Sequence, residues 1–256
     1  MTPTTLGPVN RVGAPSCTIW SPRPTISYPT RTESGILRDN AADIAERLGS
    51  DVQLVELGSG SSVKVRILLD ALNKPYAYVP IDISRDHLAQ AAQAIQEAYP
   101  DLRVEAIAAD FAQPFDLPPR GAGKRVGFYP GSSIGNFTPA EAESFLKLWA
   151  GRLGAGALML IGVDLQKDAA ILEAAYDDAQ KVTAAFSLNL LARANRELGA
   201  DFDLKAFRHE ARYRADEGRV EISLVALKDT EVTLDGRRFT FEEGERLHVE
   251  DSWKYT

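Results

Sequence analysis

The pattern of apolar and polar positions alternates regularly through the first two thirds of the chain. Between residues 52 and 163, short apolar runs alternate with stretches in which apolar residues recur every three or four positions. The short runs predict buried strands, and the longer spacing predicts amphipathic helices. This alternation predicts an α/β fold with a doubly wound, Rossmann-like parallel sheet. Strands are expected at 53–57, 76–83, 103–108, 125–129 and 157–163, and helices at 62–72, 85–99 and 139–153.

Two of these segments carry additional local signals. Residues 138–141, Thr-Pro-Ala-Glu, supply an N-cap, a proline for the first turn and a glutamate placed for a capping box. Gly154 follows the same helix as a stop signal. The run 157–163 is apolar at both odd and even positions, which is expected of a strand covered on both faces.

The rhythm changes after residue 164. Two long helical stretches, 169–178 and 181–198, follow one another with no strand between them. Three short runs then predict antiparallel strands, and the last two flank Asp235-Gly236, a pair typical of a two-residue hairpin turn. These runs are 220–227, 231–234 and 238–241. The sequence therefore predicts an inserted α+β lobe.

The first thirty residues differ from the rest of the chain. They hold six of the 14 prolines, and the first acidic residue is Glu33. Repeated proline interrupts helices, so this segment is expected to be a loosely ordered tail. A rough helical stripe begins near Thr32 and ends at Gly49. We expect three parts: the tail at 1–31, a Rossmann-like domain at 32–164, and a substrate-binding lobe with a return to the core at 165–256.

Composition narrows the class of protein. The chain has 256 residues and a formal net charge of −7, which argues against binding to nucleic acid or an anionic membrane. Its one cysteine, Cys17, excludes an internal disulfide and fits a reducing compartment. No run reaches the roughly 18 apolar residues that a membrane span needs. We expect a cytoplasmic protein, monomeric, with a small-molecule substrate and no nucleic-acid or membrane partner.

The segment Val55-Glu56-Leu57-Gly58-Ser59-Gly60 carries the first chemical signal. An apolar strand runs directly into two glycines, whose lack of a Cβ lets the backbone approach a nucleotide-like ligand. A dinucleotide fingerprint has a third glycine at the position of Val63. Its absence favours S-adenosylmethionine over a nicotinamide cofactor. An ordinary tight turn between strand and helix is the alternative.

Carboxylates follow the next two expected strands. Asp82 ends the second strand, where an acidic side chain can accept hydrogen bonds from both ribose hydroxyls, or can simply cap the next helix. Asp110 and Phe111 close the third strand and suit the amino group and ring face of an adenine. Taken with the glycine loop, these residues predict an adenosine site.

A loop rich in small residues follows the fourth strand. It reads Tyr129-Pro130-Gly131-Ser132-Ser133-Ile134-Gly135-Asn136-Phe137 and reaches the carboxyl edge, where doubly wound sheets bind ligands. The amide of Asn136 can donate a hydrogen bond to a carboxylate. A plain loop before a capped helix would leave this amide and the two glycines unexplained.

These motifs together are similar to those of one family. The segments Tyr28-Pro29-Thr30-Arg31-Thr32-Glu33, Glu56-Leu57-Gly58-Ser59-Gly60, the loop 129–137 and Tyr176-Asp177-Asp178 resemble the histidine Nα-methyltransferases of ergothioneine biosynthesis. The resemblance covers roughly residues 28–255. It implies a Rossmann-like methyltransferase sheet and transfer of methyl groups from S-adenosylmethionine to the α-amino group of L-histidine, up to trimethylation (hercynine).

The resemblance also implies roles for individual residues. The cofactor would be bound by Gly58, Gly60, Lys64, Asp82, Asp110 and Phe111. The substrate would be bound by Tyr28, by Asn136 and Tyr176 at its α-carboxylate, and by Glu250 and Ser252 at its imidazole. No catalytic residue or metal is implied, and the three histidines, His87, His209 and His248, have no metal-like spacing.

The sequence departs from the family pattern in three places. A proline-rich tail with Ser27 stands where the family has an aromatic segment, and the family continues about thirty residues past the position of Thr256. Ile222 replaces a methionine that commonly lines the substrate pocket. Two alternatives therefore stay open: methylation of another aromatic amino acid such as tryptophan, and a shortened, non-catalytic protein that binds S-adenosylmethionine. A nicotinamide dehydrogenase is disfavoured by Val63.

Overall fold

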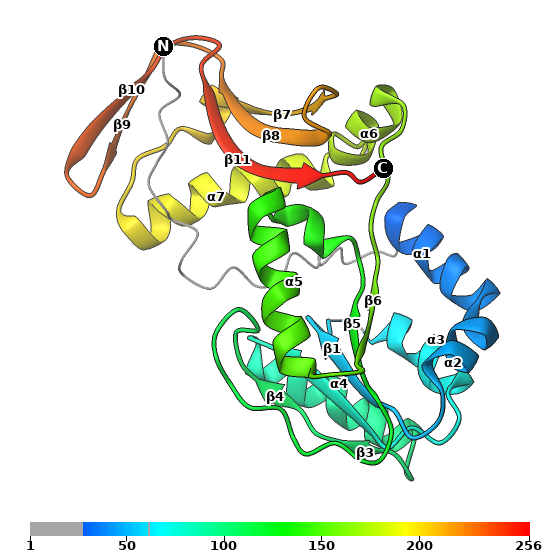
Figure 1. The fold of residues 1–256 in the computed structure, drawn as a ribbon. Helices are drawn as coiled ribbons and strands as arrows, with labels where there is room; N and C mark the ends of the chain where they lie inside the picture. Colours follow the sequence, from blue (N-terminus) through cyan, green and yellow to red (C-terminus); the bar gives the residue numbers. More distant parts are fainter. Residues whose placement is uncertain (1–27, 61) are drawn as a thin grey trace. The chain divides into compact units, whose positions relative to one another are not determined.

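The computed structural model describes residues 28–60 and 62–256, which form two compact units (Figure 1). The first unit comprises residues 28–163, and the second comprises Asp164–Thr256. The division falls one residue before the boundary expected from the sequence. The proline-rich segment up to Ser27 lies outside the described residues.

The first unit alternates helices and strands, as the apolar pattern predicts. Its strands are β1 (Gln53–Leu57), β2 (Ala77–Asp82), β3 (Arg103–Val104), β4 (Ile107–Ala108), β5 (Arg125–Tyr129) and β6 (Leu158–Ile161). Its helices are α1 (Tyr28–Asp39), α2 (Ala41–Leu48), α3 (Val63–Ala71), α4 (Arg85–Ala98), α5 (Pro139–Leu153) and the short 3₁₀ turn η2 (Ser133–Asn136).

These strands form one parallel sheet in the order β3-β2-β1-β5-β6, with β4 also pairing with β2. The order reverses between β1 and β5, which is the switch point of a doubly wound sheet. The Rossmann-like fold predicted from the sequence is confirmed.

The strand expected at 103–108 is interrupted, and Pro80 explains why. The register of β2 against β3 (Ala77↔Arg103) continues unchanged into β4 (Ile81↔Ile107). On either side of Pro80, two carbonyls of β2 accept hydrogen bonds from the neighbouring chain segment. The Tyr78 carbonyl accepts from Glu105 N at 2.9 Å, and the Asp82 carbonyl accepts from Ala109 N at 3.1 Å. Pro80 has no N–H to donate towards the same side, so the ladder breaks there.

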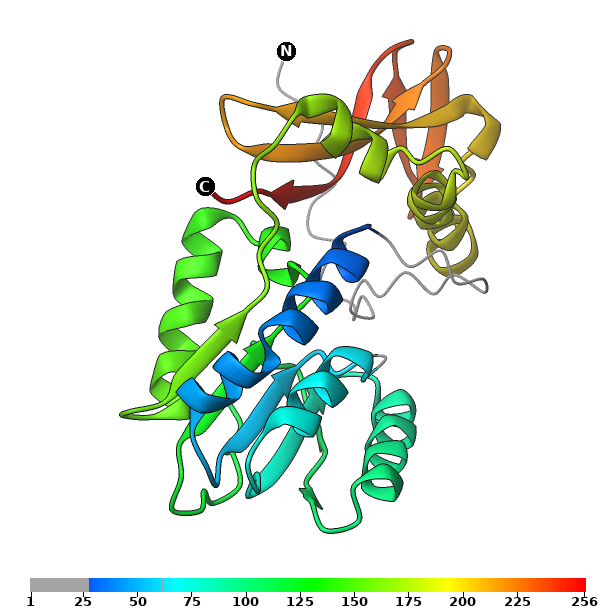
Figure 2. The same ribbon diagram turned by 90° about the vertical axis from the view of Figure 1, so that its right-hand side faces the viewer.

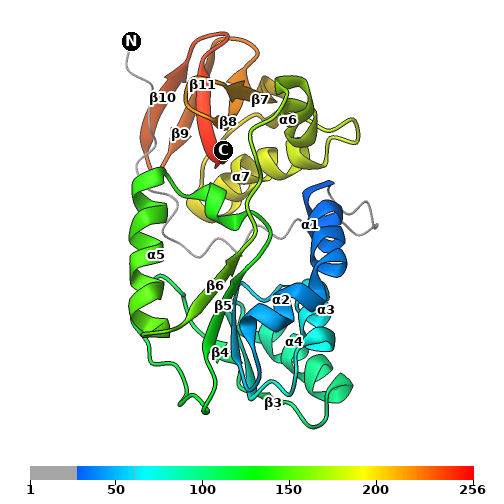
Figure 3. The same cartoon turned by 45° about the vertical axis from the view of Figure 1, so that its right-hand side comes forward.

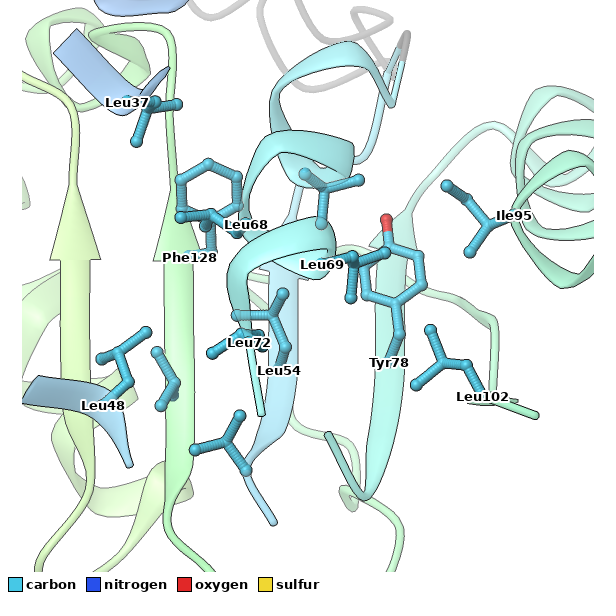
Figure 4. Packing of buried hydrophobic residues seen from close by; sticks show 13 residues of the cluster. Leu37, Leu48, Leu54, Leu68, Leu69, Leu72, Tyr78, Ile95, Leu102 and Phe128 are labelled. Carbon is cyan, nitrogen blue, oxygen red and sulfur yellow. The ribbon is translucent and has the colours of Figure 1, made fainter. Parts of the chain in front are cut away.

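The core of this unit lies between the sheet and the helices α1 to α4. Figure 4 shows Leu54, Tyr78 and Phe128 of three neighbouring strands facing Leu68 and Leu69 of α3. All five side chains are buried. The apolar positions of the strands therefore have a continuous helical cover on this face.

Helix α5 covers the opposite face of the sheet (Figure 3). Its capping box forms as predicted, since the Thr138 hydroxyl accepts from Glu141 N at 3.3 Å and the Glu141 carboxylate accepts from Thr138 N at 2.9 Å. Gly127 of β5 faces α5, and a Cβ on it would lie 2.9 Å from Leu153. A larger residue at Gly127 would therefore require the Leu153 side chain to shift.

Two expectations for this unit are wrong. Residues 28–31, expected in the loosely ordered tail, form the start of α1 instead. Proline is tolerated in the first turn of a helix, so Pro29 does not prevent this. The run 157–163 was expected to be covered on both faces, but Leu158 is 37% exposed and Val163 44% exposed. Its strand, β6, is an edge strand of the sheet.

The second unit is α+β, as expected. It contains α6 (Ala169–Tyr176), α7 (Val182–Leu198), the 3₁₀ turn η3 (Leu204–Ala206), β7 (Phe207–Arg214), β8 (Arg219–Ala226), β9 (Thr230–Leu234), β10 (Arg237–Phe241) and β11 (Arg246–Trp253). A three-stranded antiparallel sheet has the order β11-β8-β7, and β9 pairs with β10 as a separate hairpin (Figure 2). Asp235 and Gly236 turn this hairpin with φ of 50° and 69°, which confirms the predicted turn.

The apolar face of the three-stranded sheet packs on both helices. Leu224 and Phe207 contact Leu191 of α7, while Val220 and Ile222 contact Leu172 of α6. Strand β11 contains a bulge between His248 and Glu250, since His248 pairs with Ser223 and Glu250 with Ile222. Within the described residues, no helix has the length and apolar content needed to cross a bilayer.

Candidate functional site

The backbone register of the parallel sheet places three predicted cofactor residues along one edge. Leu57 pairs with Ile81, and Asp82 pairs with Ala108, so Gly58, Asp82 and Asp110 follow three adjacent strand ends. Two hydrogen bonds tie these ends together, from Gly58 N to the Ile81 carbonyl at 2.9 Å and from Ala109 N to the Asp82 carbonyl at 3.1 Å. This carboxyl edge is where open α/β sheets bind ligands.

The loop after β1 has the conformation that its glycines allow. Gly58 has φ of 74° and Gly60 has φ of 26°, and nothing lies within 4 Å of a Cβ placed on Gly58. The hydroxyls of Ser59 and Ser62 are buried and have no hydrogen-bond partner among residues 28–60 and 62–256. Buried hydroxyls of this kind need a partner, and a ligand lying against the loop would supply one. The loop therefore fits an adenosyl group.

Asp82 is buried at the end of β2 and keeps part of its hydrogen-bonding capacity. One carboxylate oxygen accepts from Ser84 N at 2.8 Å, and the other has no partner among the described residues. Asp110 is exposed, and its Oδ1 accepts from Ala112 N at 2.8 Å in the same local pattern. Each carboxylate is thus fixed by its own turn and retains one oxygen for a ligand.

Phe111 is held in an aromatic cluster. Its ring meets Tyr129 of β5 and Phe145 of α5 edge to face, with centroid distances of 6.0 Å in both cases. Arg152 donates to the Phe111 carbonyl at 2.7 Å and fixes the backbone at the same point. The ring therefore has a defined position beside Asp110.

Lys64, predicted to bind the cofactor, is paired with Glu33 of α1. The same Glu33 carboxylate accepts from Gly131 N with both oxygens, at 2.9 Å and 3.0 Å. Gly162 leaves room for this carboxylate, because a Cβ there would lie 1.8 Å from Glu33 Oε1. Glu33 therefore joins the first helix, the helix after the glycine loop and the loop after β5. Glu33 lies within the motif at 28–33, but the sequence alone indicates no role for it.

Glu56, the last acidic residue before the glycine loop, was also missed. Its side chain is buried and accepts a hydrogen bond from the Tyr78 hydroxyl. Burial raises the pKa of Glu56 to about 8, against the opposing effects of Tyr78 and of the Lys64 ammonium. An acidic residue inside an apolar strand is the sequence signal that could have identified it.

Asn136, a predicted substrate residue, ends the 3₁₀ turn after β5 and is exposed. The turn begins after Gly131 and Ser132, which have φ of 86° and 57°. Tyr28, expected at the substrate, is the first residue of α1.

The second unit brings Tyr176 and Ser252 into direct contact. The Tyr176 hydroxyl lies 2.7 Å from Ser252 Oγ, although the two residues are 76 positions apart in the chain. Lys254 Nζ donates to both, at 2.7 Å and 2.8 Å, and pairs with Asp164 Oδ2 at 3.3 Å. Sequence reasoning missed Lys254 and Asp164. The available sequence signal was the position of Lys254, two residues after Ser252, because side chains two apart on a strand point to the same face.

Glu250 lies on the same face of β11 as Ser252. It is opposite Ile222, and Ser252 is opposite Val220, and both partners are fully buried. Residues directly opposite in a sheet point to the same face, so this carboxylate belongs to the face that α6 covers. Burial and the nearby charge of Asp251 raise the pKa of Glu250. No described side chain donates a hydrogen bond to it.

His209 contacts the backbone of Tyr176. Its Nε2 lies 2.8 Å from the Tyr176 carbonyl and its Nδ1 lies 3.1 Å from the Ser187 hydroxyl. The ring is buried and both nitrogens are engaged, which makes it a structural histidine that ties α6 to α7. Among the residues that the structure describes, no three His, Cys, Asp or Glu side chains are grouped as metal ligands.

The parallel sheet, the glycine loop and the carboxylates after adjacent strands define a class, the Rossmann-like folds that bind nucleotide-like ligands at the carboxyl edge of the sheet. The profile of the family described as histidine-specific, SAM-dependent methyltransferases matches residues 27–256. The chain belongs to this family, and S-adenosylmethionine is the cofactor.

Curated relatives agree with the family profile. The chain is 43% identical over 233 residues to histidine N-alpha-methyltransferase of Mycolicibacterium smegmatis, covering 89% of this chain and 72% of the relative. It has the same identity and coverage with the protein of that name from Mycobacterium tuberculosis. It is 31% identical over 238 residues to ergothioneine biosynthesis protein 1 of Neurospora crassa, covering 90% of this chain and 27% of the relative.

Proposed function

We propose that this protein transfers methyl groups from S-adenosylmethionine to the α-amino nitrogen of L-histidine, up to the trimethylated product, as a step of ergothioneine biosynthesis. The observation that carries the proposal is that Glu250 and Ser252 lie on one face of β11 and that the Tyr176 hydroxyl of α6 is hydrogen-bonded to Ser252. A carboxylate beside paired hydroxyls suits the two nitrogens of an imidazole, since one accepts and the other donates hydrogen bonds.

The proposed cofactor site uses the carboxyl edge of the parallel sheet. Gly58 and Gly60 would let the backbone approach the ligand, and the free oxygen of Asp82 would accept from the ribose. Asp110 and Phe111 would contact the adenine, and Lys64 would lie beside the loop in its pair with Glu33. The bound cofactor supplies an electrophilic methyl group on its sulfonium sulfur.

The substrate side would work by positioning rather than by covalent chemistry. Asn136 would hold the α-carboxylate, and Tyr28 is proposed as a further substrate residue. Tyr176 is hydrogen-bonded to Ser252, so we propose that it acts with Ser252 and Glu250 at the ring rather than at the α-carboxylate. The α-amino group must be neutral to attack, so exclusion of water from the site favours reaction. Alignment of reacting groups can contribute roughly 7–11 kcal/mol, so no dedicated catalytic residue is required.

A larger aromatic amino acid such as tryptophan is a second candidate, because Ile222 lies directly opposite Glu250 in place of the family's methionine. Ile222 is fully buried against Leu172, however, which leaves its side chain little freedom to move aside. Histidine is therefore the preferred substrate.

The function is tested by incubating the purified chain with isotope-labelled S-adenosylmethionine and a panel of amino acids, followed by mass analysis. Mono-, di- and trimethylated histidine are expected, with little product from other amino acids. Methylated tryptophan alone would contradict the proposal. Cofactor binding by calorimetry without any product would indicate a non-catalytic protein.

Glu250→Gln is expected to raise the KM for histidine about 10- to 100-fold with a smaller change in kcat, because the substituted amide can present N–H rather than an acceptor to the ring. Steady-state kinetics with histidine measure the effect. Glu217→Gln, an exposed carboxylate paired with Arg219, is the matched control and should behave as the wild type. An unchanged KM in the Glu250 variant would remove this residue from ring recognition.

Location and assembly stay predictions. The single Cys17 supports a reducing, cytoplasmic compartment, and a monomer remains the expectation from the sequence. Size-exclusion chromatography with light scattering would decide the second point.

A further inference from the structure

Lys254 is the most deeply buried charged group of the second unit. Its side chain is 0% exposed, and its ammonium lies 4.6 Å from the centre of the Tyr176 ring. A lysine ammonium has three N–H donors and no acceptor. Here the three donors face three oxygens, on Tyr176, Ser252 and Asp164. The hydrogen-bonding capacity of Lys254 is therefore used entirely inside the protein, and none is left for a ligand.

This arrangement restricts the two hydroxyls. Tyr176 and Ser252 each accept from Lys254, and one of them also donates to the other. If Tyr176 donates, Ser252 has accepted twice, so its own proton must point outward. If Ser252 donates, the outward proton belongs to Tyr176. In both cases the pair offers one O–H to a ligand, and the receiving hydroxyl has both acceptor positions filled.

We propose that Lys254 is a positioning residue that holds the Tyr176–Ser252 pair as a hydrogen-bond donor towards the substrate ring. Glu250, on the same face two residues away, supplies the complementary acceptor. The site then selects a ring that carries a lone-pair nitrogen together with an N–H. This inference rests on the proposed function and adds to it the group that sets the direction of the hydrogen bonds.

The chain contains a matched control for Lys254. Lys167 pairs with the other oxygen of Asp164, at 2.5 Å, and contacts neither hydroxyl of the pair in any described bond. Lys167→Met and Lys254→Met each remove one ammonium from the same carboxylate. Only the second also removes the donor to Tyr176 and Ser252. A difference in ring selectivity between these variants therefore reports the loss of hydrogen bonds to Tyr176 and Ser252 rather than the loss of an ion pair with Asp164.

The test measures ring selectivity by binding, on protein saturated with S-adenosylhomocysteine. Calorimetry compares β-thiazolylalanine, whose ring has a lone-pair nitrogen but no N–H, with β-thienylalanine, whose ring has neither. Both thiazolyl regioisomers are used, and the tighter one is taken. Wild type and Lys167→Met are expected to bind the thiazolyl compound at least about tenfold more tightly. In Lys254→Met this preference should fall to about twofold or less.

Removing a buried lysine can leave Asp164 without sufficient compensation and unfold the protein. The double variant Asp164→Asn/Lys254→Met removes both charges and should show the same loss of preference. A folded variant without Lys254 that keeps the tenfold preference overturns the inference while leaving the proposed function intact. A wild-type protein that binds neither histidine nor these analogues overturns the proposed function, and the inference with it.

Discussion

Gly162→Ala is expected to lower the free energy of unfolding by about 2–3 kcal/mol, although the backbone there tolerates a side chain. The new Cβ would lie 1.8 Å from Glu33 Oε1 and 2.9 Å from its Cδ, so the carboxylate must rotate away. Lys64 then loses its ion-pair partner, and Gly131 N loses its acceptor. Both carboxylate and ammonium are mostly buried, at 17% and 15% exposure, so water replaces these interactions only in part.

Denaturant unfolding of the purified variants measures this effect. Gly151→Ala is the control, since this glycine lies in α5 and nothing lies within 4 Å of a Cβ there. Alanine in place of a helical glycine should leave stability unchanged or raise it. Glu33→Ala should cost about as much as Gly162→Ala, and the double variant should cost no more than either. Additive losses would show that the two residues act separately.

Glu56→Gln is expected to make the stability of the first unit far less sensitive to pH. The pKa of Glu56 is raised to about 8 from 4.5 by burial, so the folded protein keeps a proton that the unfolded chain releases. Raising the pH from below 4.5 to above about 8 therefore destabilises the folded state, by on the order of 5 kcal/mol in total. Glutamine carries no such proton and keeps the polar contact with Tyr78.

The free energy of unfolding should be measured between pH 6 and pH 9. Over this range the wild type should lose about 2–3 kcal/mol more than Glu56→Gln. Glu97→Gln, an exposed carboxylate on α4, should follow the wild-type profile. Parallel profiles for wild type and Glu56→Gln would mean that Glu56 is ionised in the folded protein at neutral pH.

Elements with strong local signals were predicted closely. The strand at 53–57, the strand at 125–129 and the helix with its capping box at 138–141 have the expected bounds. Their signals lie within a few residues: a short apolar run, or the hydrogen bonds between Thr138 and Glu141. The parallel arrangement of the strands also follows from the alternation of strand and helix, since parallel strands need crossover connections.

Two strands of the second unit were not predicted. β7 reads Phe-Arg-His-Glu-Ala-Arg-Tyr-Arg, and its charged positions obscure an inward face that includes Phe207 and the buried His209. In β11 the apolar alternation is interrupted by the bulge after His248. A search for alternating apolar residues misses a buried polar residue whose hydrogen bonds are made inside the fold. It also misses a strand in which a bulge changes which alternate residues face inward.

The site residues could be proposed from the sequence, but their connections could not. Gly58 and Asp82 were recognisable because each follows an apolar strand. The contacts of Glu33 with Lys64 and Gly131 span up to 98 residues, and those of Lys254 with Tyr176 span 78. Such contacts depend on strand register and helix packing, which no local pattern specifies.

The bulge in β11 has a consequence for transferring this recognition surface to another scaffold. Odd-numbered residues face inward before Val249, and even-numbered residues face inward after it. Leu247 and Glu250 therefore share a face although they lie three residues apart. Grafting residues 247–254 onto an ordinary strand would turn Asp251 and Trp253 inward and present Glu250 and Ser252 to the wrong side. A designer would have to copy the irregular backbone or omit one residue, because the one extra residue at the bulge decides which side chains face the site.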